Sequence, residues 1–265
     1  MNGQNTESDK ERENICDNGY IVPNDRVNIV VGAFGSGKTE VSVNWSIALS
    51  AHGHAVRLAD LDMANPYFRT REAQQLLRSK GVTPVIPSGE VQFSDLPVLI
   101  PQIKGMLQHV SDKDICIFDV GGDEPGAKVL ASLRSAIGDT VYSLYQVING
   151  RRPFTNTLQG CIEMKENIER VSGLHVTNYI INTHLMDLTT DSIVREGLIL
   201  GENLSLETNI PVAFAAVMED TVDVVKLRKT SRYPIAVMKR VMLPPWLNVN
   251  AAQSWPLAVA ERKGR

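Results

Sequence analysis

The sequence has little cysteine, few aromatic side chains and no long apolar run. Its 265 residues include three cysteines, and these lack the paired spacing of a metal site. Reduced thiols in a cytoplasmic protein are therefore expected. No apolar stretch approaches the ~20 residues that cross a membrane as a helix. The N-terminus is polar and charged, unlike a signal peptide, so we expect neither a membrane span nor secretion.

An excess of basic charge is missing as well. Lysine and arginine total 27 against 30 aspartate and glutamate residues, which gives a net charge of −3 and a pI of about 6.0. DNA is therefore not an expected partner. Hydrophobic residues make up 43% and charged residues 22%, as in ordinary globular proteins. We expect a mobile polar tail at 1–20, one main domain at 21–242 and an irregular extension at 243–265.

Apolar runs alternate with helical patterns from residue 27 onward. Several of these runs are continuous, as in strands that are buried on both faces. The alternation predicts an α/β fold with a doubly wound, mostly parallel sheet and helices on both faces. Ligands of such folds bind at the carboxyl ends of the strands. The expected strands are 27–31, 55–59, 83–86, 115–120, 140–148, 177–181 and 212–217, and the expected helices are 38–51, 70–80, 96–109, 127–137, 157–171, 193–200 and 222–229.

One glycine-rich run carries the strongest chemical signal. Residues 32–39 read G-x-x-x-x-G-K-T between an apolar strand and a helix, which is the context of a phosphate-binding loop. Glycines let successive backbone N–H groups curl around phosphate oxygens, and the next helix points its N-terminus at them. The run predicts a nucleoside triphosphate with Mg²⁺ and a P-loop three-layer sandwich. The residues expected to hold the nucleotide are Gly32, Ala33, Phe34, Gly35, Ser36, Gly37, Lys38, Thr39 and Glu40.

Carboxylates follow two of the other expected strands. Asp60 and Asp62 are placed to act on Mg²⁺, on its waters or on the attacking water, although either could instead cap a helix. Asp119 ends an apolar run in the Walker B pattern, and Gly122 lets the backbone approach the γ-phosphate. The expected catalytic residues are Lys38, Asp62 and Asp119, and the expected metal ligands are Thr39, Asp60 and Asp119.

A further strand at 179–181 ends in Asn182. An asparagine at this strand end suits hydrogen bonding to a nucleobase, although it could equally be an ordinary turn residue. Guanine recognition usually uses Asn-Lys-x-Asp, in which the aspartate accepts from the guanine N–H groups. Leu185 stands at that position and offers no acceptor, so adenine is favoured and the expected ligand is ATP.

These signals, in this order, resemble the SIMIBI class of P-loop NTPases, in particular the MinD/ParA and CobQ/CobB-like ATPases. The resemblance implies that Asp62 positions the hydrolytic water, that Asp60 lies in the outer shell of Mg²⁺ and that Asn182 reads adenine. Partitioning ATPases of this class carry a signature lysine where this chain has Ala33. Its absence counts against a nucleotide-sandwich dimer, while another kind of homodimer stays possible.

Two arginine-bearing segments also follow strand ends. Arg69 and Arg71 lie where a switch segment would sense the γ-phosphate, and Arg151 or Arg152 could act as an arginine finger. The alternative for both segments is a solvated basic turn.

The sequence as a whole predicts a P-loop ATPase, with Mg²⁺-dependent ATP binding and slow hydrolysis. Hydrolysis would act as a switch for a protein partner or for delivery of a cofactor or metal. One alternative is an ATP-dependent kinase or ligase of the CobQ/CobB and dethiobiotin-synthetase type, whose small-molecule acceptor pocket could include Ser88 and Glu90. A second alternative is a nucleotide-gated binding module without turnover.

Overall fold

A computed structural model describes residues 21–62, 74–85, 101, 103–107, 114–122 and 124–241. Their core is one parallel sheet, which has eight strands in the order β3-β2-β4-β1-β5-β6-β7-β8. This confirms the predicted α/β class. The strands are β1 (Val27–Gly32), β2 (Ala55–Asp60), β3 (Thr83–Val85), β4 (Asp114–Asp119), β5 (Tyr142–Ile148), β6 (Asn178–Ile181), β7 (Val212–Met218) and β8 (Ile235–Met238).

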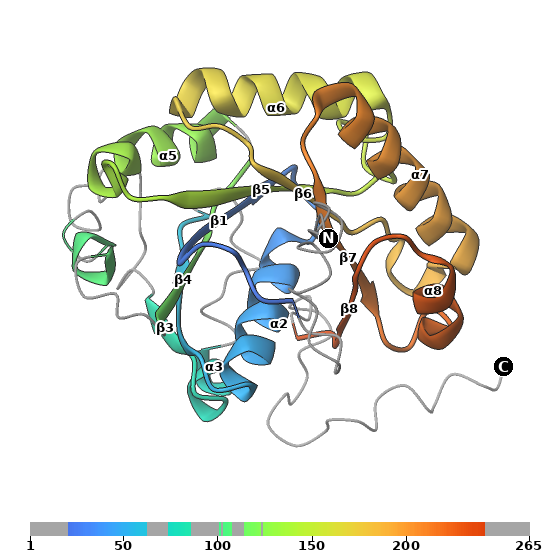
Figure 1. The fold of residues 1–265 in the computed structure, drawn as a ribbon, viewed down its shortest axis with the longest axis horizontal. Coiled ribbons are helices and arrows are strands. Elements are labelled where there is room, and N and C mark those ends of the chain that lie inside the picture. The colour runs from blue at the N-terminus through green and yellow to red at the C-terminus, as the bar shows by residue number, and fades with distance from the viewer. Residues whose placement is uncertain are drawn as a thin grey trace, which may run out of the picture.

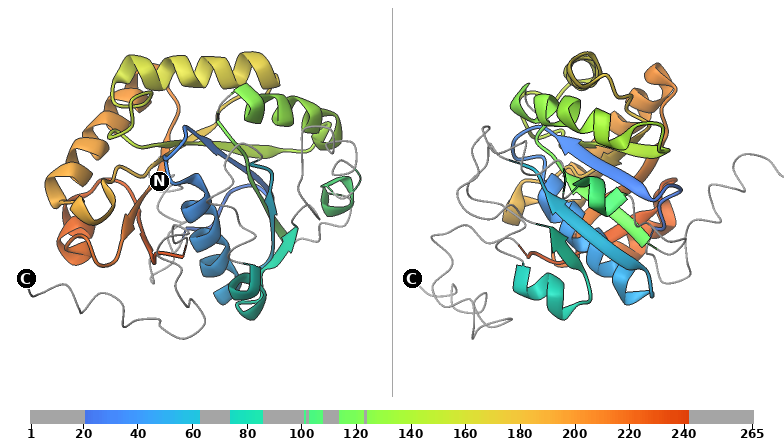
Figure 2. Two further views of the ribbon diagram at one scale, coloured as in Figure 1. Left: turned by 180° about the vertical axis from the view of Figure 1, so that it is seen from behind. Right: turned by 90° about the vertical axis from the view of Figure 1, so that its left-hand side faces the viewer.

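Helices cover both faces of this sheet, as Figure 1 and Figure 2 show. Helices α5 and α6 lie side by side on one face, with α7 beside them, and α2 lies on the opposite face. The helices are α2 (Lys38–Ala51), α3 (Gln74–Ser79), α5 (Glu124–Ile137), α6 (Leu158–Ser172), α7 (Asp191–Thr208) and α8 (Val224–Thr230), with a short 3-10 turn at Met186–Leu188. None of the helices in the described ranges is both long enough and apolar enough to cross a membrane.

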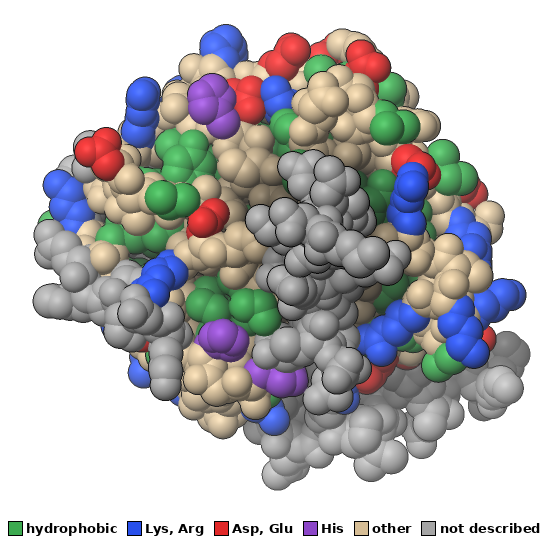
Figure 3. Space-filling model, viewed as in Figure 1, with side chains coloured by type: hydrophobic (Ala, Val, Ile, Leu, Met, Phe, Trp, Pro, Cys, Tyr) green, Lys and Arg blue, Asp and Glu red, His purple; other side chains and the backbone are tan. Residues whose placement is uncertain are grey.

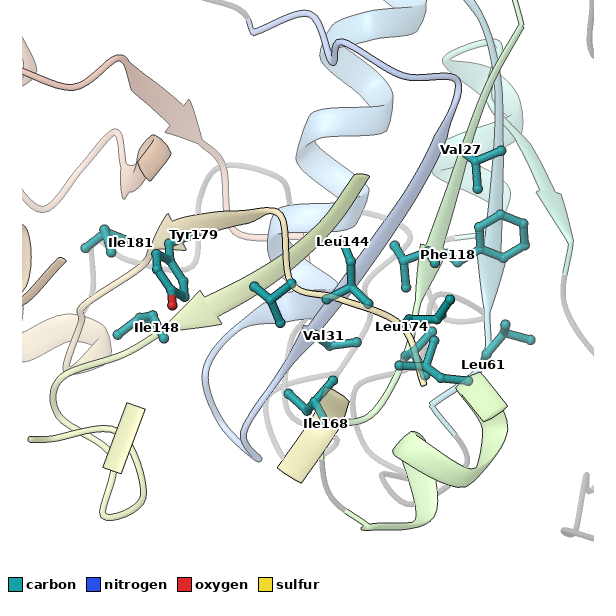
Figure 4. Packing of buried hydrophobic residues seen from close by; sticks show 14 of the residues in the cluster. Val27, Val31, Leu61, Phe118, Leu144, Ile148, Ile168, Leu174, Tyr179 and Ile181 are labelled. Atoms are coloured by element: carbon teal, nitrogen blue, oxygen red, sulfur yellow. The ribbon is translucent and has the colours of Figure 1, made fainter. Parts of the chain in front are cut away.

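The strands are buried on both faces, and successive side chains point to opposite layers. In β1, Val27, Ile29 and Val31 belong to the apolar cluster under α5, α6 and α7, whereas Val30 belongs to the cluster around Trp45 of α2. Figure 4 shows Val27 and Val31 packed with residues of neighbouring strands and α6. The period of two explains why these strands read as continuous apolar runs in the sequence.

The structure differs from the predicted elements in several details; for example, α5 begins at Glu124 instead of 127. β8 was not predicted, because its apolar run is only four residues long and follows a proline. Helix α7 runs from Asp191 to Thr208 instead of 193–200, between an N-cap at Thr190 and a left-handed Asn209. Helix α6 begins at Leu158 after an N-cap at Thr157, close to the predicted start at 157. The predicted tail at 1–20 and the predicted extension at 243–265 lie outside the described residues. Of the predicted helix 70–80, residues 74–80 are described and α3 forms at Gln74–Ser79. Of the predicted helix 96–109, only residues 101 and 103–107 are described.

Basic and acidic side chains are interspersed over the described surface that Figure 3 shows. This mixture of signs agrees with the small net charge of −3. Such a surface carries no strong field of one sign over that face.

Candidate functional site

The glycine-rich run forms a loop between β1 and α2. Gly35 and Gly37 have φ angles of 73° and 84°, which glycine adopts without strain. The N-cap of α2 is Gly37, which has no side chain to bond the first N–H groups of the helix. N–H groups and a helix dipole in this arrangement are typical of loops that bind anions. The loop and its place before α2 agree with the predicted phosphate site.

Gly122 lies against the beginning of this loop. Its N–H donates to the Gly32 carbonyl oxygen at 3.1 Å. A Cβ atom at position 122 would lie 2.5 Å from the carbonyl carbon and oxygen of Gly32, so any other residue would push the two segments apart. The backbone after β4 is thereby held against the glycine-rich loop.

Charged side chains gather at the carboxyl ends of β1, β2 and β4. The Lys38 Nζ atom lies 2.5 Å from Oδ2 of Asp62, and both side chains are buried. Asp60 Oδ1 accepts the backbone N–H of Asp62 at 3.2 Å. Asp60 and Asp119 are register neighbours on adjacent strands. We call Lys38, Thr39, Asp60, Asp62 and Asp119 the phosphate-side cluster.

The pKa of the Asp119 carboxylate is raised by its surroundings. Burial raises its pKa to about 8, opposed by the nearby Lys38 ammonium and the Thr39 hydroxyl and reinforced by Asp60 and Asp62. Neither Asp119 carboxylate oxygen has a geometrically good hydrogen bond to the described part of the protein. A buried carboxylate with two such oxygens suits Mg²⁺ or its waters.

No group of three His, Cys, Asp or Glu side chains among the described residues has the arrangement of a complete metal site. Mg²⁺ in phosphate-binding loops takes much of its shell from phosphates and water, so one carboxylate and one hydroxyl are sufficient protein ligands. The residues present therefore fit Mg²⁺ bound with a nucleotide, and they do not fit a metal held by protein alone.

Asn182 lies on the other side of the loop. Its Nδ2 atom donates to the Ser36 carbonyl oxygen at 2.8 Å, and its side chain is buried. The space that a side chain at Gly37 would need is filled by the Asn182 amide. This amide therefore fixes the loop. Asn182 lies at the predicted site, where it contacts the loop backbone.

Asn149 is a site residue to which the sequence assigned no role. Its side chain is buried and contacts three loops. Nδ2 donates to the carbonyl oxygens of Gly35 at 3.4 Å and His184 at 3.3 Å. Oδ1 accepts the backbone N–H groups of Arg151 at 3.0 Å and His184 at 3.2 Å. The signal that could have found it is an asparagine at the end of β5, which is the strand paired with β1.

The two candidate finger arginines contact protein groups. Arg151 forms an ion pair with Glu196 of α7. Arg152 donates from Nε to the Gly35 carbonyl oxygen at 2.9 Å. Their positions favour a role in fixing the loops over a role as a finger. We call Asn149, Arg152, Asn182 and His184 the loop network.

Three other predicted loop residues occupy distinct surroundings. Ala33, where partitioning ATPases have their lysine, is buried, whereas Phe34 is 67% exposed. The Glu40 carboxylate accepts the backbone N–H of Val241 and an N–H of Asn44 at 3.3 Å, so it faces the segment after β8. Four further residues that the sequence singled out, Arg69, Arg71, Ser88 and Glu90, lie outside the described residues.

Solved structures with this fold include the signal recognition particle receptor FtsY and a protein of the signal recognition particle. The signal recognition particle receptor FtsY from Elizabethkingia anophelis in complex with GDP matches with a TM-score of 0.52 and 19% identity, over 79% of this chain and 63% of that chain. FtsY from Thermotoga maritima matches with a TM-score of 0.50 and 21% identity, over 79% of this chain and 68% of that one. The 54 kDa signal recognition particle protein from Aeropyrum pernix in complex with GDP matches with a TM-score of 0.52 and 13% identity, over 80% of this chain and 45% of that chain.

No protein-family model matches the chain, and no curated protein matches it in sequence. At identities of 21% or less, the structural matches above establish the fold. The chain therefore has the fold of these proteins. The sequence resemblance to the SIMIBI class of P-loop NTPases agrees with that fold. The chain spans only about 63% of the FtsY structure from Elizabethkingia anophelis.

Proposed function

We propose that this chain binds a nucleoside triphosphate with Mg²⁺, hydrolyses it slowly and acts as a conformational switch. The observation that carries the proposal is the phosphate-side cluster next to the glycine-rich loop at the N-terminus of α2. Lys38 and three buried carboxylates lie at the carboxyl ends of adjacent strands. Burying so many charges is costly unless they serve a ligand or a metal.

Each member of the cluster has a task in this proposal. Lys38 binds the β- and γ-phosphates, and Asp62 orients the attacking water. Thr39 and Asp119 hold Mg²⁺, with Asp60 acting through its waters. Bound Mg²⁺ would neutralise charge on the phosphates. Positioning and charge neutralisation are most of what phosphoryl transfer requires from a protein.

The switch in this proposal is the contact between Gly122 and Gly32. The segment after β4 is joined to the phosphate-binding loop by one backbone hydrogen bond of 3.1 Å. A γ-phosphate beside Gly122 would stabilise this arrangement, and its loss would release it. The output would be altered affinity for a protein partner, or delivery of a cofactor or metal.

We propose ATP as the preferred nucleotide and GTP as its rival. Leu185 supplies no acceptor for the guanine N–H groups, which supports ATP. Two of the structurally similar proteins are complexes with GDP, which supports GTP. A kinase or ligase remains the second candidate function, because a pocket lies directly beside Ala33 and Gly122, where an acceptor could reach the γ-phosphate.

Titration of the full chain with ATP and with GTP, with Mg²⁺ and with EDTA, tests the proposal. ATP should bind more tightly than GTP, binding should strengthen with Mg²⁺, and slow release of phosphate should follow. Asp119→Asn should remove the effect of Mg²⁺, whereas the control Asp139→Asn, an exposed carboxylate, should not.

Four other results would change the proposal in defined ways. Tighter binding of GTP than of ATP would overturn only the choice of base. Tight ATP binding without turnover would favour a binding module. Release of ADP only when an acceptor is added would favour a kinase or ligase. Binding of neither nucleotide would overturn the proposal as a whole.

A further inference from the structure

A pocket of about 580 Å³ lies beside the phosphate-binding loop. Ala33, Phe34 and Gly122 line it on the side of the loop, and the first half of α6 with the segment before it lines the other side. Its volume is within the range of small-molecule sites. None of the tasks proposed for the phosphate-side cluster uses this pocket.

Aromatic surface is left uncovered at this pocket. Phe34 is 67% exposed and Phe154 is 68% exposed, and both rings line the hollow together with Met164. Exposed aromatic side chains beside a pocket are surface that a bound molecule would cover. The faces of aromatic rings carry negative charge and attract organic cations.

The pocket lining carries a negative charge, which suits a cationic ligand. Among the described residues that line it, Glu163 carries the only charge. Gln159 donates to its Oε1 atom at 3.1 Å and orients the carboxylate one turn along α6. The neighbouring cation of α6, Lys165, is paired with Glu169 at 2.8 Å, and Arg170 donates to Asn167 at the far end of the pocket.

The N-terminus of α6 also lies at this pocket, through Thr157 and Gly160. Its dipole disfavours a cation in the first turn. Glu163 lies in the second turn, so a cation is favoured at the carboxylate and an uncharged part of the ligand at the helix end.

We propose that this pocket binds a small organic ammonium compound, whose apolar body packs on Phe34, Phe154 and Met164 and whose cationic group faces Glu163. The role given to the bound ammonium compound rests on the proposed function, because it requires a nucleotide in the neighbouring phosphate site. Gly122 borders both the pocket and that proposed site. An ammonium compound bound there would lie next to the γ-phosphate and be positioned as the acceptor or effector of the switch.

The probe for this site is phenethylammonium chloride, with 2-phenylethanol as its neutral counterpart and 3-phenylpropionate as its anionic one. Binding is followed by NMR titration of the full chain. The ammonium should bind about tenfold more tightly than the alcohol, and the carboxylate should not bind. Glu163 is exposed, so Glu163→Gln should weaken ammonium binding about threefold, and Phe154→Leu should weaken all binding. The control Glu166→Gln changes another exposed carboxylate of the same helix, one that does not line the pocket, and should have no effect.

Equal binding of the ammonium and the alcohol, or binding that survives Glu163→Gln, would overturn the inference. A lysine-rich peptide that binds where the free ammonium does not would also overturn it, in favour of a protein partner. A fluorescent ATP analogue added to the same samples separates this inference from the proposed function. If the ammonium bound through Glu163 but the nucleotide did not bind, only the proposed function would be overturned. If the nucleotide bound but the ammonium did not, only this inference would be overturned.

Discussion

The two sides of the candidate nucleotide site are built from different chemistry. The phosphate-side cluster consists of buried charges, with Lys38 and Asp62 in direct contact. The loop network consists of the Asn149 and Asn182 amides with Arg152 and His184, and its amides hydrogen-bond to backbone groups of three loops. Charges of this kind are costly to bury and indicate a ligand, whereas satisfied amide bonds fix a shape. We therefore expect changes in the first region to affect nucleotide binding most, and changes in the second to affect stability.

The largest expected effect tests the charged side. Lys38→Met keeps the length of the side chain but removes the ammonium. ATP affinity, measured by calorimetry, should fall on the order of 100-fold, because charge-assisted hydrogen bonds to phosphate are lost. The control Lys229→Met, at an exposed lysine of α8, should leave the affinity unchanged. Unchanged affinity in the Lys38 variant would show that the loop does not bind phosphate through this lysine.

The next effect tests the neutral side. Asn149→Ala removes four part-buried hydrogen bonds that the buried Asn149 side chain makes to backbone groups of three loops. The free energy of unfolding should fall by about 2 kcal/mol in urea titrations, since these backbone groups lose their partners. Asn203→Ala, at an exposed position of α7, should change it by less than about 0.5 kcal/mol. If both variants were equally stable, the network would not be holding the loops together.

The sequence predicted the charged side well and the neutral side poorly, for a physical reason. A phosphate-binding loop must place glycines, a lysine and a hydroxyl within one short segment, so its pattern is readable locally. Strand ends then predicted the positions of Asp60, Asp62 and Asp119, because parallel strands end at the same edge. The alternation of apolar runs and helical patterns also predicted much of the fold. It did not predict the short edge strand β8.

The hydrogen bonds of the loop network join residues that are far apart in sequence. Asn149 contacts Gly35 and His184, and Arg152 contacts Gly35, across separations of 114, 35 and 117 residues. No local pattern records such partners, so Asn149 looked like a strand end and Arg152 like a solvated turn. The contact of Glu40 with the segment after β8 was hidden for the same reason, because it spans 201 residues.

A third prediction joins the two sides at Gly37. An alanine there would meet a positive φ of 84° and the Asn182 amide, whereas at Gly53 it would meet a φ of 90° and nothing within 4 Å. Gly53→Ala should therefore cost about 1 kcal/mol of stability, from backbone strain alone. Gly37→Ala should cost about 2 kcal/mol or more and also weaken ATP binding, because the loop must move away from Asn182. Urea unfolding and calorimetry measure both effects, and equal losses would contradict the packing of Asn182 on the loop.

The smallest expected effect is the pH dependence contributed by the neutral ring of His184. Burial lowers its pKa to about 4 from an ordinary 6.5, helped by the positive charges of Arg152 and Arg240. The backbone N–H of Met186 donates to Nδ1 at 3.3 Å, which also requires a neutral ring nitrogen. The unfolded chain takes up the proton first, so this contribution to stability is complete above pH 6.5 and is lost as the pH falls towards 4.

The loss should be about 2 kcal/mol, below the full linkage value because the ring keeps some access to solvent. Other groups titrate over the same range, so the difference between two proteins is the useful quantity. His184→Gln keeps an uncharged polar group at this position and cannot take up a proton. Its urea stability should therefore fall about 2 kcal/mol less than that of the original chain between pH 7 and pH 4. Parallel curves for the two proteins would mean that His184 is solvated like a surface residue, and the loop network would then be more open than its hydrogen bonds indicate.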